Sequence, residues 1–367
     1  MPPQSLPHAP CQEGNSAGPS EAERQAHVAL LRQHAVTTCR LMDTHAFRFE
    51  AQRIGDTVTS ASSKKRIRDV MKAVTALEAN MPIAWHSSVH VAVDEDRQDV
   101  LRVLILPDQD TPYANGAFVF DMLLPAKFPE SPPKVRPPPA PLFLAAHPRE
   151  ELAPARLPER TYVTADTSVA LQMSFLTTGG GTVRFNPNLY NCGKVCLSLL
   201  GTWSGPSWDP QTSTVLQVLV SLQAMVFCPE PYYNEPGWDS QRGTANGTQQ
   251  MTAYNTRVIQ DTAKWAIAAV LEAPMKHPHG VFADVLCLHW ANKRSVIERM
   301  LSDSGVPADI CNRVCSHALL TSPTSSWCQP PRERLCDVGA RAHRRTARVW
   351  QTTPQHCFEW CSPPEMI

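Results

Sequence analysis

Residues 89–124 constrain the fold of this chain more than any other stretch. Apolar residues occupy every second position over residues 89–93 and again over residues 118–124, and residues 100–106 form a largely apolar run. Short connections separate the three, and the second contains the turn Asn115-Gly116. A period of two is the signature of β-strands, and strands joined by short turns pair in antiparallel order. The stretch therefore predicts an antiparallel meander.

Helices are expected on both sides of these strands. Apolar residues recur at intervals of three and four from Ile67 to Leu77, after a serine at position 62 or 63 that can cap a helix. Similar apolar faces predict helices at 214–227, 254–271 and 281–301. A proline-rich stretch after residue 128 leads to a short fourth strand at the sheet edge, because proline cannot donate to a strand ladder. The order of helix, four-stranded meander, loop and helices predicts an α+β fold.

The chain divides into regions by composition and pattern. Residues 1–60 are predicted to form an N-terminal extension that is largely disordered, with one helix at 22–40. The core domain is expected to span residues 61–305. Residues 136–171 within it show no clear period and are expected to form a surface loop. Residues 306–367 are rich in Cys, Arg and Pro and are predicted to form a flexible tail.

Composition and charge exclude several classes of function. Lys and Arg together number 34, as do Asp and Glu, so no net charge favours nucleic acid or an anionic membrane as a partner. Residues 1–20 lack the apolar core of a secretory signal, and the apolar stretch 215–227 is too short to span a bilayer. The twelve cysteines are spread over 367 residues, which favours a reducing compartment over a disulfide scaffold. A cytoplasmic or nuclear protein is expected.

Cys196 is the strongest candidate for a reactive group. It follows Asn188 by eight positions, and Asn188 itself follows Pro187, which stiffens the turn. A sulfur nucleophile that attacks an acyl group needs an accessible thiolate and hydrogen-bond donors for the oxyanion that forms in the transition state. The carboxamide of Asn188 can be such a donor.

The same segment resembles the catalytic segment of ubiquitin-conjugating (E2) enzymes. In that family a His-Pro-Asn tripeptide precedes Gly-x-(hydrophobic)-Cys-Leu at the offset that separates Asn186-Pro187-Asn188 from Gly193-Lys-Val-Cys-Leu197. Within the family, the chain is most similar to the E2 domain of BRUCE/Apollon-type proteins, and large E2/E3 hybrid enzymes share part of the pattern. The segments that carry this narrower resemblance are Thr177–Gly180, Val183–Asn191, Gly193–Ser198, Pro210–Ser213, Leu216–Ser221 and Asn234–Gly237.

The resemblance implies the E2 fold, in which residues 136–171 look like an insertion, and a transferase activity. An activating enzyme (E1) would consume ATP and deliver ubiquitin as a thioester to Cys196, and a lysine of a substrate or of ubiquitin would then attack, so this chain itself would bind no cofactor and no metal. Asn188 is implied to support the backbone and to stabilise the oxyanion. Asn186 stands where the histidine of the usual tripeptide stands, and with Pro187 it is implied to support the active site structurally.

The acceptor lysine must lose its proton before it attacks, because its free pKa is about 10.4. Related enzymes place polar groups after the helix that follows the active site, which points here to Tyr233, Asn234 and Glu235, with Asp209 as a second possibility on a nearer loop. Each of these is also an ordinary turn residue in the alternative interpretation.

Partner recognition is expected to depart from the simpler E2 enzymes. Those enzymes present an aromatic residue to RING-type E3 ligases in the loop that here reads Phe128-Pro-Glu-Ser-Pro-Pro, and Glu130 stands in its place. The resemblance therefore implies either an E3 with non-standard docking or direct choice of substrates. Trp203 and Trp208, in the loop after Cys196, either pack that loop or shape a channel for the ubiquitin tail, and packing is the commoner role of large aromatics.

Other hypotheses remain open at this point. The domain could be a catalytically silent E2-like module that binds ubiquitin or a ligase, or a thiol hydrolase in which a histidine activates Cys196. Cys192 is predicted to be dispensable, although it could pair with Cys196 in a metal site. A zinc module in the tail is conceivable, although the spacing of its candidate ligands matches no strong pattern; these are Cys311, Cys315, His317, Cys328, Cys336, His356, Cys357 and Cys361.

Overall fold

The computed structural model describes residues 19–57, 61–130 and 172–318. Its centre is a five-stranded sheet with the strand order β1-β2-β3-β4-β5. Strands β2 to β5 pair in antiparallel order, so the predicted four-stranded meander is confirmed. Its edge strand β5, however, begins at Gln172, whereas the sequence placed the fourth strand just after the proline-rich stretch, in residues outside the described ones. The strands are β1 (Val36–Cys39), β2 (Ser88–Asp94), β3 (Val100–Leu106), β4 (Phe118–Leu123) and β5 (Gln172–Phe175).

The fifth strand comes from the N-terminal region. Helix α1 (Glu21–Arg32) begins at a capping box formed by Ser20 and Glu23, β1 then pairs parallel with β2, and α2 (Arg48–Thr57) follows. The prediction of a largely disordered extension is therefore wrong for residues 19–57, and the predicted helix at 22–40 ends at Arg32. A four-residue strand has too few positions to show a period, and its parallel partner lies more than 50 residues away, so local pattern carries no signal of either.

Both faces of the sheet are covered, since every residue of β2, β3 and β4 is buried. On one face the segment that follows β1 bonds directly to the strands. The ring nitrogen Nε2 of His45 lies 2.9 Å from the Leu101 carbonyl, and the Ala46 N–H donates to the Asp121 carboxylate over 2.7 Å. Arg102 pairs with the same carboxylate over 2.7 Å. The N-terminal segment is thus part of the core domain, which the sequence placed at 61–305.

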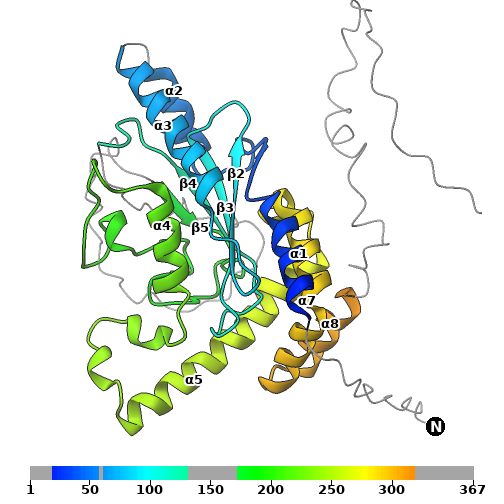
Figure 1. Cartoon of the computed structure of the whole chain (residues 1–367). Coiled ribbons are helices and arrows are strands. Elements are labelled where there is room, and N and C mark those ends of the chain that lie inside the picture. The colour runs from blue at the N-terminus through cyan, green and yellow to red at the C-terminus, as the bar shows by residue number, and fades with distance from the viewer. Residues whose placement is uncertain (1–18, 58–60, 131–171, 319–367) are drawn as a thin grey trace, which may run out of the picture. The chain divides into compact units, whose positions relative to one another are not determined.

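Helix α3 (Ala61–Asn80) lies between β1 and β2 in the chain, and the C-terminal helices follow β5 (Figure 1). Helix α4 (Val215–Ser221) starts at a capping box of Thr214 and Gln217 and continues as a π-helical stretch to Val226. Helix α5 (Ala245–Asp261) continues through a π-helical stretch, Thr262–Ala268, into α6 (Ala269–Glu272), and α7 (Ala283–Asp303) comes next. Helices are confirmed at all three predicted places, although α5 begins nine residues earlier than expected. Short 3-10 turns occupy Ser198–Leu200, Pro231–Asn234, Asp239–Gln241 and His279–Phe282.

A further helix, α8 (Ala308–Ala318), lies in the region that was predicted to be a tail. Its residues Ile310 and Val314, four positions apart, are buried in the core, and α8 packs against α6 and α7. The tail prediction is therefore wrong for 308–318, because one short apolar stripe among Cys and Arg residues gives a weak periodic signal. The predicted insertion at 136–171 and residues 319–367 lie outside the described residues.

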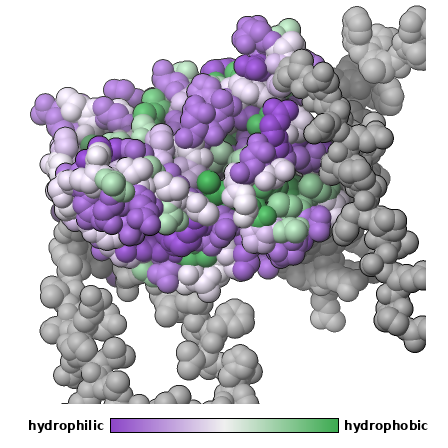
Figure 2. All heavy atoms as spheres, turned by 90° about the horizontal axis from the view of Figure 1, so that it is seen from below, coloured by the Kyte–Doolittle hydropathy of each residue, from purple (hydrophilic) through white to green (hydrophobic). Residues whose placement is uncertain are grey.

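The surface agrees with a protein that keeps its apolar residues inside. Figure 2 shows one face on which hydrophilic side chains dominate and apolar ones form small separate groups among the coloured residues. No helix in the described part of the chain has the length and apolar character needed to cross a membrane.

Candidate active site

Two reciprocal hydrogen bonds join Asn188 to Cys196. The Cys196 N–H donates to the Asn188 carbonyl over 2.8 Å, and the Asn188 side-chain amide donates to the Cys196 carbonyl over 2.8 Å. Between them the chain reverses at Gly193, whose φ of 84° lies in the left-handed region that favours glycine. The structure therefore brings the two predicted catalytic residues together, and Asn188 supports the backbone as the resemblance implied.

The side chain of Asn186 holds the turn in place through three hydrogen bonds. Its Oδ1 accepts the Asn188 N–H over 2.8 Å, and its Nδ2 donates to the Tyr113 hydroxyl over 2.9 Å and to the Val226 carbonyl over 2.8 Å. The Tyr113 hydroxyl in turn donates to the Phe185 carbonyl over 3.1 Å. All polar atoms of the buried Asn186 side chain thus have partners, as a buried amide requires. Tyr113 was not predicted, because it lies 73 residues before Asn186 in the sequence.

Thr202 holds the backbone on both sides of the cysteine. Its hydroxyl accepts the Leu197 N–H over 2.9 Å and lies 3.1 Å from the Val195 carbonyl, to which it can donate. Thr202 was not predicted either, since a threonine in a loop is too common to stand out by itself. The segment that carries Cys196 is therefore fixed by side chains from two places, Asn188 before it and Thr202 after it.

The Cys196 side chain itself is nearly covered, at 2% exposure, whereas Cys192 is exposed. Burial raises the pKa of the Cys196 thiol, while the positive charges of Lys194 and Arg184 act in the opposite direction. An accessible thiolate was expected, and this structure instead holds a protected thiol beside an open groove.

The groove next to Cys196 has a volume of about 440 Å³. It brings together Asn188 and three of the four residues predicted to serve the acceptor lysine, Tyr233, Asn234 and Glu235. Asp239 adds a carboxylate that sequence reasoning did not single out. Leu197 and Ser198, the two residues that follow the cysteine, also line it. The remaining lining residues are Trp203, Ser204, Met225, Val226, Pro236 and Gly237.

Asp209 does not line this groove. Its exposed carboxylate accepts the Gln211 N–H over 2.9 Å and the Thr212 hydroxyl over 2.8 Å, and these bonds lower its pKa. This arrangement is an ordinary Asx turn. The structure thus favours the local structural interpretation for Asp209, which the sequence had left as the alternative.

An ion pair joins the loop that carries Glu235 to the turn that carries Asn188. Arg184 Nη2 lies 3.2 Å from the Glu235 carboxylate and donates to the Pro187 carbonyl over 2.8 Å. The guanidinium also lies over the Tyr190 ring, 4.3 Å from its centroid. Sequence reasoning missed Arg184 because its partner is 51 residues away. The contact places a positive charge between the turn and the loop that carries Glu235.

The two tryptophans of the loop after Cys196 have different positions. Trp208 is buried, donates its ring N–H to the Pro129 carbonyl over 2.9 Å and lies 6.2 Å from the Phe128 ring, so it packs the loop as the commoner role predicts. Trp203 lines the groove instead. Glu130 is exposed and pairs with Lys65 on α3 over 3.0 Å.

The candidate zinc ligands are only partly described. Cys311, Cys315 and His317 are positions of α8, whereas Cys328, Cys336, His356, Cys357 and Cys361 lie outside the described residues. Over residues 19–57, 61–130 and 172–318, no group of three or more His, Cys, Asp or Glu side chains has an arrangement that could hold a metal ion.

Comparison with known proteins connects this geometry to one family. The family model described as ubiquitin-conjugating enzyme matches residues 71–144 and 170–262, which include β2 to β5, the Asn188 turn, Cys196 and α4. The mouse dual E2 ubiquitin-conjugating enzyme/E3 ubiquitin-protein ligase BIRC6 is 39% identical over 253 residues, which are 68% of this chain and 4% of the mouse protein.

Smaller relatives show the same similarity. The probable ubiquitin-conjugating enzyme protein 17 of Caenorhabditis elegans is 34% identical over 71% of this chain and 30% of that protein. The putative ubiquitin-conjugating enzyme E2 38 of Arabidopsis thaliana is 34% identical over 58% of this chain and 52% of that protein. The matched region is thus 4% of the length of the mouse protein and about half of the length of the plant protein.

Proposed function

The chain contains a ubiquitin-conjugating enzyme (E2) domain, and on this premise we propose that it accepts ubiquitin from an E1 enzyme as a thioester on Cys196 and transfers it to a lysine. The observation that carries the proposal is the pairing of Asn188 with Cys196 beside an open groove. A catalytically silent module would need neither a thiol nor an amide at these positions.

Both proposed steps are acyl transfers. In the first, the Cys196 thiolate attacks the carbonyl carbon of the ubiquitin C-terminus, and the thiolate of the E1 cysteine leaves. In the second, a neutral lysine amine attacks the new thioester, the Cys196 thiolate leaves, and the amine loses a proton to form an amide. Each step passes through a tetrahedral species with a negative oxygen. Because Cys196 is only 2% exposed, loading requires the side chains around it to move apart.

Asn188 is the proposed donor to that oxygen. One N–H of its amide already donates to the Cys196 carbonyl, so the second N–H remains for an oxyanion. The same hydrogen bond fixes the amide relative to the sulfur, and a donor that is held in place before the reaction costs no reorganisation in the transition state.

The groove is the proposed entry for the acceptor lysine. Glu235, Asn234 and Asp239 supply oxygen acceptors on its wall, which can orient the amine and receive its proton. The Arg184–Glu235 ion pair holds this wall against the catalytic turn. We assign Arg184 to positioning, because it acts on the amine only through Glu235, and Tyr233 to the lining of the same wall.

Partners are proposed from the same features. Ubiquitin and an E1 follow from the two-step reaction, with ATP consumed by the E1. The charged Lys65–Glu130 pair stands where an aromatic contact to a RING-type ligase would be expected, so we propose that any E3 docks differently or that the chain selects substrates directly, as an E2/E3 hybrid. The name of the mouse relative, a dual E2/E3 enzyme, supports the second possibility.

One assay tests the proposal against its alternatives. Purified protein is incubated with E1, ATP and ubiquitin, then a loaded sample is chased with free lysine. Formation of an adduct that lysine discharges supports the transferase. Stable binding of ubiquitin with no adduct would instead support a silent module, and cleavage of a ubiquitin conjugate without ATP would support a hydrolase. Either result would reject the proposed function.

A further inference from the structure

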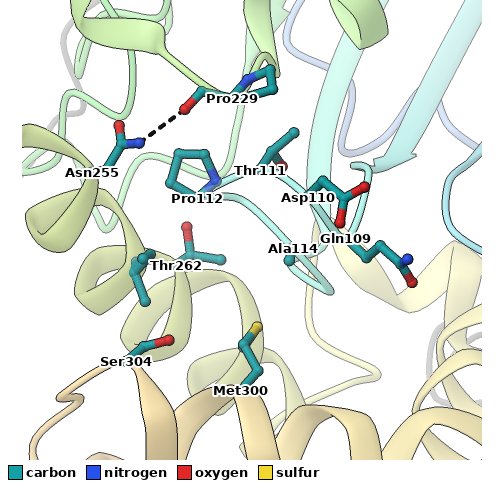
Figure 3. Close-up of a pocket in the computed structure, with 11 residues that line it drawn as sticks. Gln109, Asp110, Thr111, Pro112, Ala114, Pro229, Asn255, Thr262, Met300 and Ser304 are labelled. Atoms are coloured by element: carbon teal, nitrogen blue, oxygen red, sulfur yellow. Dashed lines mark hydrogen bonds between the residues drawn. The ribbon is translucent and has the colours of Figure 1, made fainter. Parts of the chain in front are cut away.

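A second pocket, away from Cys196, is built to accept hydrogen bonds. It has a volume of about 330 Å³ and shares no lining residue with the groove beside Asn188. Four segments form it, as Figure 3 shows: the loop between β3 and β4, the loop at Pro229, helix α5 with the start of its π-helical continuation, and the C-terminal end of α7. Residues Asn255, Ile259 and Thr262 follow one another at helical intervals and face it together.

Two buried oxygens at this pocket have no hydrogen-bond partner among the described residues. The Asn255 amide donates from Nδ2 to the Pro229 carbonyl over 2.8 Å (Figure 3). The oxygen of the same amide group, Oδ1, is buried and has no partner among the described residues. The Thr262 hydroxyl is also unpartnered, and the whole residue is 1% exposed. Buried polar atoms normally have partners, because a buried donor or acceptor that is left unpaired has lost its hydrogen bonds to water without replacement.

The backbone and a close contact fix the direction of the Thr262 side chain. Thr262 begins the π-helical stretch, a type of irregularity that is frequent at functional sites. Its methyl group lies on the side of Gly116, where a Cβ would approach that methyl carbon to 2.8 Å. A larger residue at position 116 could not fit there.

The charge on the pocket lining is negative only. Its eleven lining residues include the exposed carboxylate of Asp110 and no Lys, Arg or His. Apolar atoms of Pro112, Ala114, Ile259 and Met300 form the walls. A fitting ligand therefore has an aliphatic stem and a cationic head with N–H donors, since a charged donor makes stronger hydrogen bonds to a carboxylate and to amide oxygens than a neutral one.

We propose that this pocket binds a basic side chain, Arg or Lys, presented by a partner or substrate protein. The cationic head bonds to Asn255 Oδ1, the Thr262 hydroxyl and the Asp110 carboxylate, and the stem packs on Ile259 and Met300. The pocket thereby gives the chain a recruitment site for a basic protein segment, separate from the site of transfer. This inference does not depend on the proposed transferase activity, because binding is measured without E1, ATP or ubiquitin.

The test uses methyl-labelled full-length protein in nuclear magnetic resonance titrations. The probes are N-acetyl-arginine amide and N-acetyl-lysine amide, and their uncharged counterparts are N-acetyl-citrulline amide and N-acetyl-norleucine amide. We expect the charged probes to shift the methyl signals of Ala114, Ile259 and Met300, with affinities about tenfold above those of the uncharged probes. Equal shifts with charged and uncharged probes, or no shifts at these methyls, would overturn the proposal.

Two variants localise the effect. Thr262→Val replaces the unpartnered hydroxyl by a methyl group, so it should lower probe affinity about tenfold while leaving the melting temperature unchanged or higher. Asp110→Asn, at an exposed position, should weaken the charged probes and leave the uncharged probes unaffected. Thr256→Val is the matched control, because Thr256 is an exposed residue of α5 outside the pocket, and its hydroxyl bonds to the Thr252 carbonyl. If Thr262→Val and Asp110→Asn both bind the charged probes like the Thr256→Val control, the site is not this pocket.

Discussion

Asn188 and Cys196 are joined by two hydrogen bonds of 2.8 Å: the side-chain amide of Asn188 donates to the Cys196 carbonyl, and the Cys196 N–H donates to the main-chain carbonyl of Asn188. Residues eight positions apart are thereby fixed as a single unit, and the orientation of the amide is coupled to the position of the sulfur. Changes at Asn188 are therefore expected to affect chemistry more than folding.

Asn188→Ala should slow the transfer of ubiquitin to lysine about 10²- to 10³-fold, the usual effect of removing one oxyanion donor. Its cost in stability should be about 1 kcal/mol, because the substitution removes the side-chain hydrogen bond to the Cys196 carbonyl while the backbone bond remains. Single-turnover discharge of loaded protein to free lysine measures the first quantity, and urea unfolding measures the second. A variant that loses most of its stability but keeps its discharge rate would contradict this division of roles.

Asn186→Ala should affect the stability of the fold more than the transfer reaction. It leaves the Asn188 N–H, the Tyr113 hydroxyl and the Val226 carbonyl each without one buried partner, which should lower the free energy of unfolding by about 2 to 4 kcal/mol. Tyr113→Phe removes only one side of this network, so it should cost less. Urea unfolding of both single variants and the double variant gives the coupling energy, and additive effects would show that the two side chains act independently.

Alkylation should distinguish the two cysteines of the catalytic loop. In the free protein, iodoacetamide at pH 8 should modify the exposed Cys192 much faster than Cys196, which is buried and has a raised pKa. Peptide-resolved mass spectrometry measures both rates in one sample. Equal rates would mean that the thiol of Cys196 is open to solvent for much of the time.

The charges around Cys196 should move its titration in predictable directions. Arg184→Gln removes a positive charge that favours the thiolate, so the pH at which Cys196 alkylation reaches half its maximal rate should rise. Glu235→Gln removes a negative charge and should lower that pH. Lys276→Gln serves as the control. It also removes a positive charge, but Lys276 is exposed and is not among the charged groups that act on Cys196. Shifts of the same sign in the Arg184 and Glu235 variants would contradict an electrostatic cause.

Buried histidines should make the fold sensitive to acid. Burial lowers the pKa of His279 to about 4, and that of His27 and His90 likewise to about 4, whereas an unfolded histidine titrates at about 6.5. Between these values the unfolded chain binds protons that the folded chain does not, so stability falls as the pH drops from about 6.5 to about 4. Urea unfolding at pH 7, 6 and 5 should show this loss, and His279→Gln should reduce its slope. A variant with an unchanged slope would exclude His279 as a contributor.

The parts of the fold that could be predicted from sequence are those with a short-range signal. The meander from Val89 to Leu124 shows a period of two, and the Asn188 to Cys196 offset lies within one loop, so both were visible in a few neighbouring residues. Strand β1 was not predicted, because it is four residues long and pairs parallel with a distant strand. The partners Tyr113 of Asn186 and Glu235 of Arg184 are 73 and 51 residues away, and only the folded chain brings them together.

The covering of Cys196 was also not predictable, since burial of one side chain depends on how the loops that follow it pack. Thr202 and Trp203 are adjacent in the sequence. Thr202 nevertheless bonds to the backbone beside the cysteine, whereas Trp203 lines the groove. No local pattern distinguishes these two outcomes.

The central claim is that Cys196 becomes covalently linked to the carboxyl end of ubiquitin, and Cys196→Ser tests it most directly. With E1, ATP and ubiquitin, the unchanged protein and Cys192→Ser should each form an adduct that a thiol reductant cleaves. Cys196→Ser should form an oxygen ester that resists the reductant, and Cys196→Ala should form no adduct. Intact-mass measurement of the four proteins reads out all these results. An adduct on Cys196→Ala, or none on the unchanged protein with an active E1, would contradict the account.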